Sequence, residues 1–298
     1  MASTKEIRRR IRSIRSTRQI TKAMELVSAA KMRRAQQQAL SSRTYARLVW
    51  ELVSNLMPQT HPELHRLLRE PQNGRKTAII LMASNRGLIG AFNNNITAKG
   101  FDYAKTQSAV AFITLGNKGR ETVKKTSEVA ADFEKLDAAA DVLEIRPVAK
   151  LVTEDFISGK YDRVVVVYMR FVSTLTQVPE VLELLPLPQS LPQGEGKEGY
   201  SSPLGGGGKV GGEYLFEPTP DAVLETLLPR LVEMQIYQAL LETNAAEHSA
   251  RMVAMKNASD AASDLVDDLT LEYNQIRQAG ITTEISEIVA GRLALQEN

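Results

Sequence analysis

Apolar side chains recur at helical spacing near the N-terminal end of the chain. These positions are Ile7, Ile11, Ile14, Ile20, Met24, Val27, Tyr45, Leu48, Leu52 and Leu56. Ser3 and Glu6 have the spacing of a capping box, and neither Gly nor Pro occurs before Pro58. The pattern therefore predicts one helix over residues 1–57. It would be roughly 80 Å long, which exceeds the helices of ordinary globular domains.

The C-terminal segment, residues 213–298, shows a clearer heptad pattern. Thr219 and Pro220 have the order of an N-cap followed by a first-turn proline, which predicts that a helix begins there. Alternating steps of four and three residues from Leu227 meet mostly apolar side chains as far as Ile276, over about seven heptads. Such a seam is typical of a coiled coil.

The two ends of the chain carry opposite charges, although the net charge of the whole chain is only +2. Residues 1–50 contain thirteen Lys and Arg against two Glu, a net charge of +11. Residues 213–298 contain five basic against fifteen acidic residues, a net charge of −10. Contact between the ends would relieve the self-repulsion of each, so we predict an antiparallel coiled coil. The alternative is two separate helices packed on a central domain, but such a domain is too small to cover 80 to 100 Å of helix, by a rough estimate.

Between the terminal helices, short apolar runs alternate with amphipathic ones. We predict strands over residues 77–84, 110–115 and 163–171, and helices over 96–107, 118–125 and 145–158. This order is typical of a small Rossmann-like α/β domain with a partly parallel sheet, placed at residues 75–185. Residues 186–212 are rich in Pro and Gly and predict a flexible surface insertion. The predicted fold class is therefore α/β with long helices.

A glycine-containing turn at residues 84–93 follows the first predicted strand. Turns of this kind can bind phosphate through the N–H groups of the following helix. The spacing here matches neither the dinucleotide fingerprint nor the P-loop, and no lysine follows the second glycine. We therefore predict no cofactor, and a nucleotide-binding α/β enzyme is kept as an alternative function.

The sequence gives little support for a thiolate, metal or catalytic site. With 43% hydrophobic and 24% charged residues and no cysteine, the chain has the composition of a soluble protein without disulfides or thiolate sites. His61 and His65 are four residues apart, but Pro62 lies between them, so we predict a solvated pair rather than a metal site. His248 lies on the heptad seam, where we expect a packing role. No catalytic arrangement is visible, and no apolar run is long enough to cross a bilayer.

The basic N-terminal segment allows several interpretations. It has the composition of a transit peptide, of a nucleic-acid arm, or of a face that meets an acidic protein. The helical pattern continues past any cleavage point, which argues against a transit peptide. The single Trp and the absence of a binding motif argue against a nucleic-acid binder, which stays as a second alternative. A merely solvated basic face is the simplest interpretation.

Four motifs carry a resemblance to a known family. They are ITKAMELVSAAKMRRA at residues 20–35, SNRGLIG at 84–90, ARMVAMKNA at 250–258 and ITTEISEIVAG at 281–291. In this order, and over nearly the whole chain, they resemble the gamma subunit of bacterial F-type ATP synthase. The resemblance implies a non-catalytic rotor shaft in a proton-translocating complex. Its coiled coil would stand inside a ring of alpha and beta subunits, and its α/β domain would sit on the c-ring beside epsilon.

The resemblance also implies contact positions and a location. Contacts with the beta subunits fall on Lys22, Met24, Arg251, Thr283, Glu284 and Ser286, the bearing tip on Leu293 and Leu295, and the c-ring and epsilon foot on Tyr214 and Glu217. The chain would be peripheral, at the cytoplasmic face of the bacterial plasma membrane. Three departures are visible: Thr283 stands where many relatives carry glutamine, Asn85 where aspartate is common, and the insertion is unusually long. Chloroplast relatives use a redox-switched dithiol, which a chain without cysteine cannot have.

Overall fold

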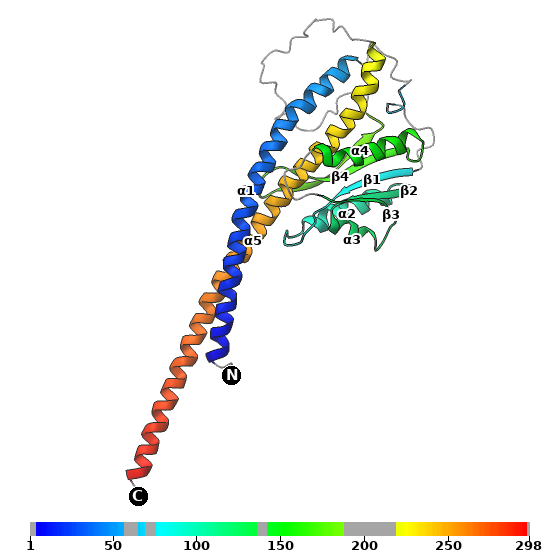
Figure 1. Ribbon diagram of the computed structural model, residues 1–298. Coiled ribbons are helices and arrows are strands. Elements are labelled where there is room, and N and C mark those ends of the chain that lie inside the picture. The colour runs from blue at the N-terminus through cyan, green and yellow to red at the C-terminus, as the bar shows by residue number, and fades with distance from the viewer. Residues whose placement is uncertain (1–3, 57–64, 69–75, 136–141, 188–218, 297–298) are drawn as a thin grey trace. The chain divides into compact units, whose positions relative to one another are not determined.

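The computed structural model of this protein describes residues 4–56, 65–68, 76–135, 142–187 and 219–296. Two long helices, α1 (Thr4–Leu56) and α5 (Pro220–Gln296), enclose the other elements in the sequence (Figure 1). The chain divides into two compact units. We call Met1–Ala30 with Ser249–Asn298 the helical unit, and Lys31–His248 the α/β unit. Both long helices contribute to both units.

In the helical unit, α1 and α5 lie side by side and run in opposite directions (Figure 1). Ile7, Ile11 and Val266 form a buried cluster. Half-buried Ile14, Leu269, Tyr273 and Ile276 pack against it. On α5, Met255, Ser259, Ala262 and Val266 are buried at alternating spacings of four and three residues. The antiparallel coiled coil and the α5 seam are thus confirmed in this unit.

The predicted seam of α1 is wrong at Ile20, Val27 and Leu48, which are exposed, while the side chains of Tyr45, Leu52 and Leu56 lie outside the described residues. Ile20 and Val27 are 58% and 56% exposed, whereas Thr21 and Ser28 are buried. The four-three spacing continues through these two hydroxyl residues, so the side of α1 that is buried is not its most apolar side here. Burial is tolerated because each hydroxyl donates to a carbonyl of its own helix, Thr21 to Arg18 at 3.0 Å and Ser28 to Met24 at 2.7 Å.

The α/β unit contains a five-stranded sheet with the strand order β3-β2-β1-β4-β5. Its strands are β1 (Lys76–Met82), β2 (Ala109–Leu115), β3 (Val129–Phe133), β4 (Arg163–Phe171) and β5 (Gln177–Leu185). Its shorter helices are α2 (Phe92–Lys105), α3 (Asn117–Val123) and α4 (Val142–Ile157). The first four strands in chain order are parallel, and β5 is antiparallel to β4. The predicted α/β domain is confirmed, while the two edge strands, β3 and β5, were not expected.

The side chains of β1 alternate between two apolar layers. Ala78, Ile80 and Met82 belong to the cluster that also contains residues of α4 and α5. On the other face α2 approaches closely, because a Cβ added at Gly100 would lie 3.1 Å from a methyl group of Leu81. The sheet is therefore covered on both faces, as parallel sheets usually are.

In the α/β unit, α5 is buried around most of its circumference. The buried residues include Leu224, Leu228, Leu231, Val232, Ile236, Ala239, Leu240 and Leu241. Of the predicted seam positions, Leu227, Met234 and Gln238 are only half-buried. A single heptad seam is therefore the wrong description for this part of α5, because the buried cluster surrounds it with side chains from the sheet, α4 and α1. The helix continues through Pro229.

Candidate functional site

The C-terminal part of α5 is an exposed helix surface. Residues 277–290 are all exposed, and among them are four large apolar side chains, Ile281, Ile285, Ile288 and Val289. Ile288 is 70% exposed. Contiguous exposed apolar residues on a folded chain mark a surface that binds a partner. Leu293 and Leu295 belong to α5, but their side chains lie outside the described residues.

Thr283, Glu284 and Ser286 lie on this exposed part of α5. The Thr283 hydroxyl donates to the Ala279 carbonyl at 3.0 Å, and the Ser286 hydroxyl donates to the Thr282 carbonyl at 2.9 Å. Each hydroxyl proton is therefore engaged within the helix, while the oxygen can still accept a hydrogen bond. Glu284 adds a negative charge to the same stretch, so this surface offers acceptors to a partner.

Lys22 and Met24 lie on α1 in the helical unit. Lys22 is exposed and its Nζ lies 3.0 Å from the Glu25 carboxylate, while Met24 is half-buried. An exposed pair of this kind contributes about 0–1 kcal/mol, so Lys22 can exchange Glu25 for the carboxylate of a partner at little cost. Arg251, on α5, is half-buried.

The sequence-predicted contact residues fall at two levels. Arg251 and Thr283 both lie on α5, separated by about 48 Å of helix at 1.5 Å per residue. The residues of the two levels therefore cannot form one site. Tyr214 and Glu217 lie outside the described residues, as does most of the predicted insertion.

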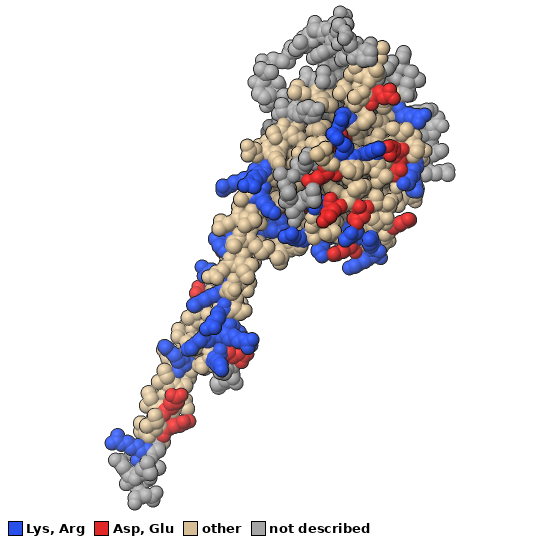
Figure 2. Space-filling view, viewed as in Figure 1, with Lys and Arg blue, Asp and Glu red and all other residues tan. Residues whose placement is uncertain are grey.

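Basic side chains dominate the exposed side of α1 in the helical unit (Figure 2). Seven of them are exposed within residues 5–18: Lys5, Arg8, Arg9, Arg10, Arg12, Arg15 and Arg18. The Arg8 guanidinium stacks on the Tyr273 ring at 5.3 Å and donates to its hydroxyl. Arg10 pairs with Glu6 of its own helix at 2.9 Å. The basic surface is thus largely directed outward, where it suits an acidic partner.

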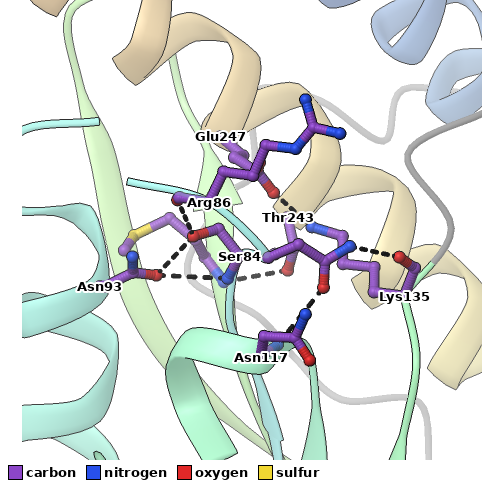
Figure 3. Close-up of polar contacts among 9 residues, drawn as sticks. Ser84, Arg86, Asn93, Asn117, Lys135, Thr243 and Glu247 are labelled. Carbon is purple, nitrogen blue, oxygen red and sulfur yellow. Dashed lines mark hydrogen bonds and ion pairs between the residues drawn. The ribbon is translucent and has the colours of Figure 1, made fainter. Parts of the chain in front are cut away.

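The turn after β1 is held by its own hydrogen bonds (Figure 3). The Ser84 N–H donates to the Asn93 amide oxygen at 3.2 Å, and the Ser84 hydroxyl donates to the Arg86 carbonyl at 2.7 Å. Leu88 and Gly90 take positive φ angles of 62° and 59° to complete the turn. The Ser84 donors that a phosphate would use are therefore already engaged.

Asn85 connects this turn to two further segments. Its side-chain oxygen accepts from the N–H of Asn117, the first residue of α3, at 3.3 Å. Its side-chain nitrogen donates to the Lys135 carbonyl (Figure 3). Gly116, just before α3, has a φ of 104°, and a Cβ there would lie 2.4 Å from the Ala83 carbonyl oxygen. The turn therefore acts as a structural connection between strand ends.

Sequence reasoning missed two buried polar contacts of α5. The Lys135 ammonium pairs with the Glu247 carboxylate, and both side chains are at least 96% buried. The Met169 N–H of β4 donates to the Thr243 hydroxyl at 3.3 Å, and Thr243 is fully buried. The sequence gives no signal that separates Thr243 and Glu247 from the neighbouring polar residues Glu242 and Asn244. Lys135 was not found because β3, the strand that ends two residues before it, was not predicted.

His65 departs from the predicted solvated pair. It is half-buried, and its Nδ1 accepts from the Leu67 N–H at 3.2 Å. Burial lowers the pKa of His65 below its ordinary value, and the nearby Glu225 opposes this effect. His61 lies outside the described residues. Among the residues that the structure describes, no three His, Cys, Asp or Glu side chains are grouped to hold a metal ion.

Long helices precede and follow a small α/β domain in this chain, and this order of elements defines its fold class. A family profile described as ATP synthase matches residues 3–295. The ATP synthase gamma chain of Opitutus terrae is 42% identical over 99% of this chain and 99% of its own length. That of Pelotomaculum thermopropionicum is 43% identical over 99% of this chain and its full length. The chain belongs to the ATP synthase gamma chain family.

Solved structures support the same fold. A chain of the Euglena gracilis mitochondrial ATP synthase, in an assembly titled OSCP/F1/c-ring, has a TM-score of 0.65 at 19% identity, covering 98% of this chain and 94% of that one. A chain of the Tetrahymena thermophila mitochondrial ATP synthase, titled central stalk/c-ring, has a TM-score of 0.59 at 20% identity and covers 80% of this chain and 99% of that one. In the part of this chain that the structure describes, no helix combines the length and apolar character of a membrane span.

Proposed function

We propose that this chain is the central rotor shaft of a bacterial F-type ATP synthase and that it has no catalytic site of its own. The observation that carries the proposal is the exposed apolar end of α5 in a chain that matches gamma chains over its full length. An apolar helix surface that no described residue of the chain covers suits a bearing formed by surrounding subunits. The proposal therefore explains why residues 277–290 are exposed on all sides.

The beta-subunit contacts are assigned to the two levels of the helical unit. Lys22 and Met24 of α1 and Arg251 of α5 form one level, and Thr283, Glu284 and Ser286, which come later in α5, form the second. Leu293 and Leu295 complete the tip. The exposed Lys22, held by a weak ion pair, supports this assignment because it can pair with an acidic loop of a beta subunit during part of each turn.

The foot is assigned to Tyr214 and Glu217, against the c-ring and epsilon. The complex would be proton-translocating and peripheral at the cytoplasmic face of the plasma membrane, with the c-ring as the membrane attachment. Rotation driven at the foot would bring different sides of the shaft to each beta subunit in turn. Since each side makes different contacts with the open and closed states of a beta subunit, the populations of those states shift with rotation.

Single-molecule rotation tests this function. The chain is assembled with its native alpha and beta subunits, a bead is attached to the α/β unit, and ATP is added. We expect rotation in one direction, with hydrolysis by the alpha and beta ring that depends on this chain. Hydrolysis without bead rotation, in complexes that contain the chain, would contradict the proposal.

The two alternative functions have their own tests. A nucleotide-binding enzyme would show saturable nucleotide binding by the isolated chain, but the Ser84 donors of the turn are engaged in internal hydrogen bonds. A nucleic-acid binder would show DNA affinity that falls steeply with salt concentration. No described contact favours either alternative over the rotor shaft.

A further inference from the structure

Burial alone does not fix how α5 is oriented in the α/β unit. Apolar contacts are non-directional, and a helix that is apolar on most sides can turn or slide by small amounts without losing buried area. Leu, Val, Ile and Ala surround this part of α5. Directional contacts are therefore needed to hold one orientation.

Three such contacts link α5 to three different segments of the α/β unit. Glu233 accepts from Arg146 of α4 at 3.2 Å. Thr243 accepts from the Met169 N–H of β4 at 3.3 Å. Glu247 pairs with Lys135, just beyond β3. We call these three contacts the polar joint.

The α5 members of the polar joint lie on one side of the helix. At about 100° per residue, Glu233, Thr243 and Glu247 fall within an arc of roughly 80°, spread over about 21 Å of helix length. Contacts in a row along one side resist both rotation of the helix about its axis and movement along it. The two that are most buried, at Thr243 and Glu247, are shielded from water and salt, so they hold under conditions that weaken exposed pairs.

The partner side of the polar joint is itself fixed. The Lys135 backbone carbonyl accepts from Asn85, and Asn85 also receives the N–H of Asn117 (Figure 3). Lys135 is thus tied to the end of β1 and the start of α3. These hydrogen bonds would transmit a force on the sheet to the backbone of Lys135, and so to its ammonium group.

We propose that the polar joint is a torsional coupling that locks α5 to the α/β domain, so that torque collected by that domain enters the shaft without slip. This inference rests on the proposed function. Lys135, Thr243 and Glu247 are positioning residues in it and contact no substrate. A buried ion pair can often be replaced by apolar residues without loss of stability, so we assign Lys135 and Glu247 to holding the orientation of α5 rather than to folding energy.

The decisive variant replaces the pair by apolar groups of similar size, Lys135→Met with Glu247→Leu. Because no charge is left buried and unpaired, we expect it to fold and assemble. The matched control is Lys105→Gln with Asp102→Asn, an exposed pair on α2 in the same unit. Both are placed in the complete ATP synthase in sealed membrane vesicles. The rate of ATP hydrolysis without an opposing gradient and the ions pumped per ATP against a gradient are measured.

We expect the double variant to hydrolyse ATP at the parental rate without load and to pump severalfold fewer ions per ATP against a gradient. The exposed-pair control should match the parent in both. If both complexes assemble and the double variant pumps as many ions per ATP as the parent, the proposal that the polar joint is a torsional coupling is overturned. If the parental chain itself supports no coupled pumping, the proposed function fails instead, so the two failures are distinguishable.

Thr243→Val supplies a second, local measurement. The substitution conserves shape but removes the hydroxyl that accepts from the Met169 N–H. In the assembled complex we expect hydrogen exchange at the Met169 amide to become about tenfold faster, because one typical hydrogen bond is lost. We also expect fewer ions pumped per ATP under load. Unchanged exchange together with unchanged pumping would overturn the assignment of Thr243.

Discussion

The helix α5 is packed in two different ways in the two units of this chain. In the α/β unit it is buried around most of its circumference, by large apolar side chains and by polar contacts at Thr243 and Glu247. In the helical unit it buries a narrow seam that includes Ser259 and Ala262, and residues 277–290 are exposed. One continuous helix is thus buried by its own domain over one part of its length and exposed over another.

The largest effect should come from breaking the buried pair of the α/β unit on one side only. Lys135→Met removes the buried ammonium that pairs with the Glu247 carboxylate, and breaking a buried pair on one side should lower the free energy of unfolding by about 3–5 kcal/mol. Urea denaturation of the full chain measures this change. Lys105→Met, at an exposed lysine, is the control and should change stability by less than about 0.5 kcal/mol. Similar values for the two variants would show that the pair is not buried in solution.

Replacing one leucine of α5 by alanine in each unit compares the stability that the same side chain contributes when it is buried and when it is exposed. Leu228 is fully buried in the α/β unit, and Leu271 is 63% exposed in the helical unit. Leu228→Ala should cost about 2–5 kcal/mol of stability through lost burial and a cavity. Leu271→Ala should fall within about 0.5 kcal/mol of the parent. Both are measured by denaturant unfolding, and equal losses would contradict the described burial.

A third substitution tests the surface of the helical unit rather than its stability. Met24→Lys introduces a cation two residues from Lys22, where a partner's acidic loop would form an additional ion pair at one rotary position. We expect the assembled complex to hydrolyse ATP but to pump fewer ions per ATP, with little change in unfolding. Met24→Leu, which keeps the size and apolar character, is the control. A fully coupled Met24→Lys complex would remove Met24 from the assigned contacts.

The smallest effect should be a pH dependence in the α/β unit. Because burial lowers the pKa of His65 below its ordinary 6.5, the unfolded chain binds a proton more readily than the folded chain. His65 therefore contributes nothing at neutral pH and destabilises the fold as the pH falls through 6.5 toward its lowered pKa. Denaturation between pH 7.5 and 5.5 should show a shallower decline for His65→Gln than for the parent. Parallel declines would mean that His65 is solvated, as the sequence suggested.

Much of the fold could be predicted because its signals are local. The interior strands β1, β2 and β4 are continuous apolar runs, and α5 begins at Pro220, where the capping pattern predicted it. The edge strands escaped detection for physical reasons. β5 contains Pro179, which a strand tolerates only at an edge, and β3 has five residues, including Asp132, which binds Arg120 at 2.7 Å.

The candidate contact residues came from motifs, and the buried polar contacts could not come from the sequence. Nothing local distinguishes Glu247, which is buried, from Glu284, which is exposed on the same helix. The burial of the two carboxylates differs because Glu247 packs against a segment distant in the sequence, which includes Lys135, whereas Glu284 is exposed. The burial of Thr21 in place of Ile20 has a related cause. The face of α1 that is buried is the one that contacts the partner helix, and this is not the most apolar face of α1.

The helical unit joins segments from the two ends of the chain, and this has a consequence for its biosynthesis. Ile7 and Ile11 pack against Val266, more than 250 residues later. A ribosome completes the sheet strands well before that residue emerges, so we expect the α/β unit to assemble first with the part of α1 that follows Ala30. Until translation is nearly finished, the basic start of α1 lacks its helical partner, and it is then most dependent on chaperones and most open to proteases.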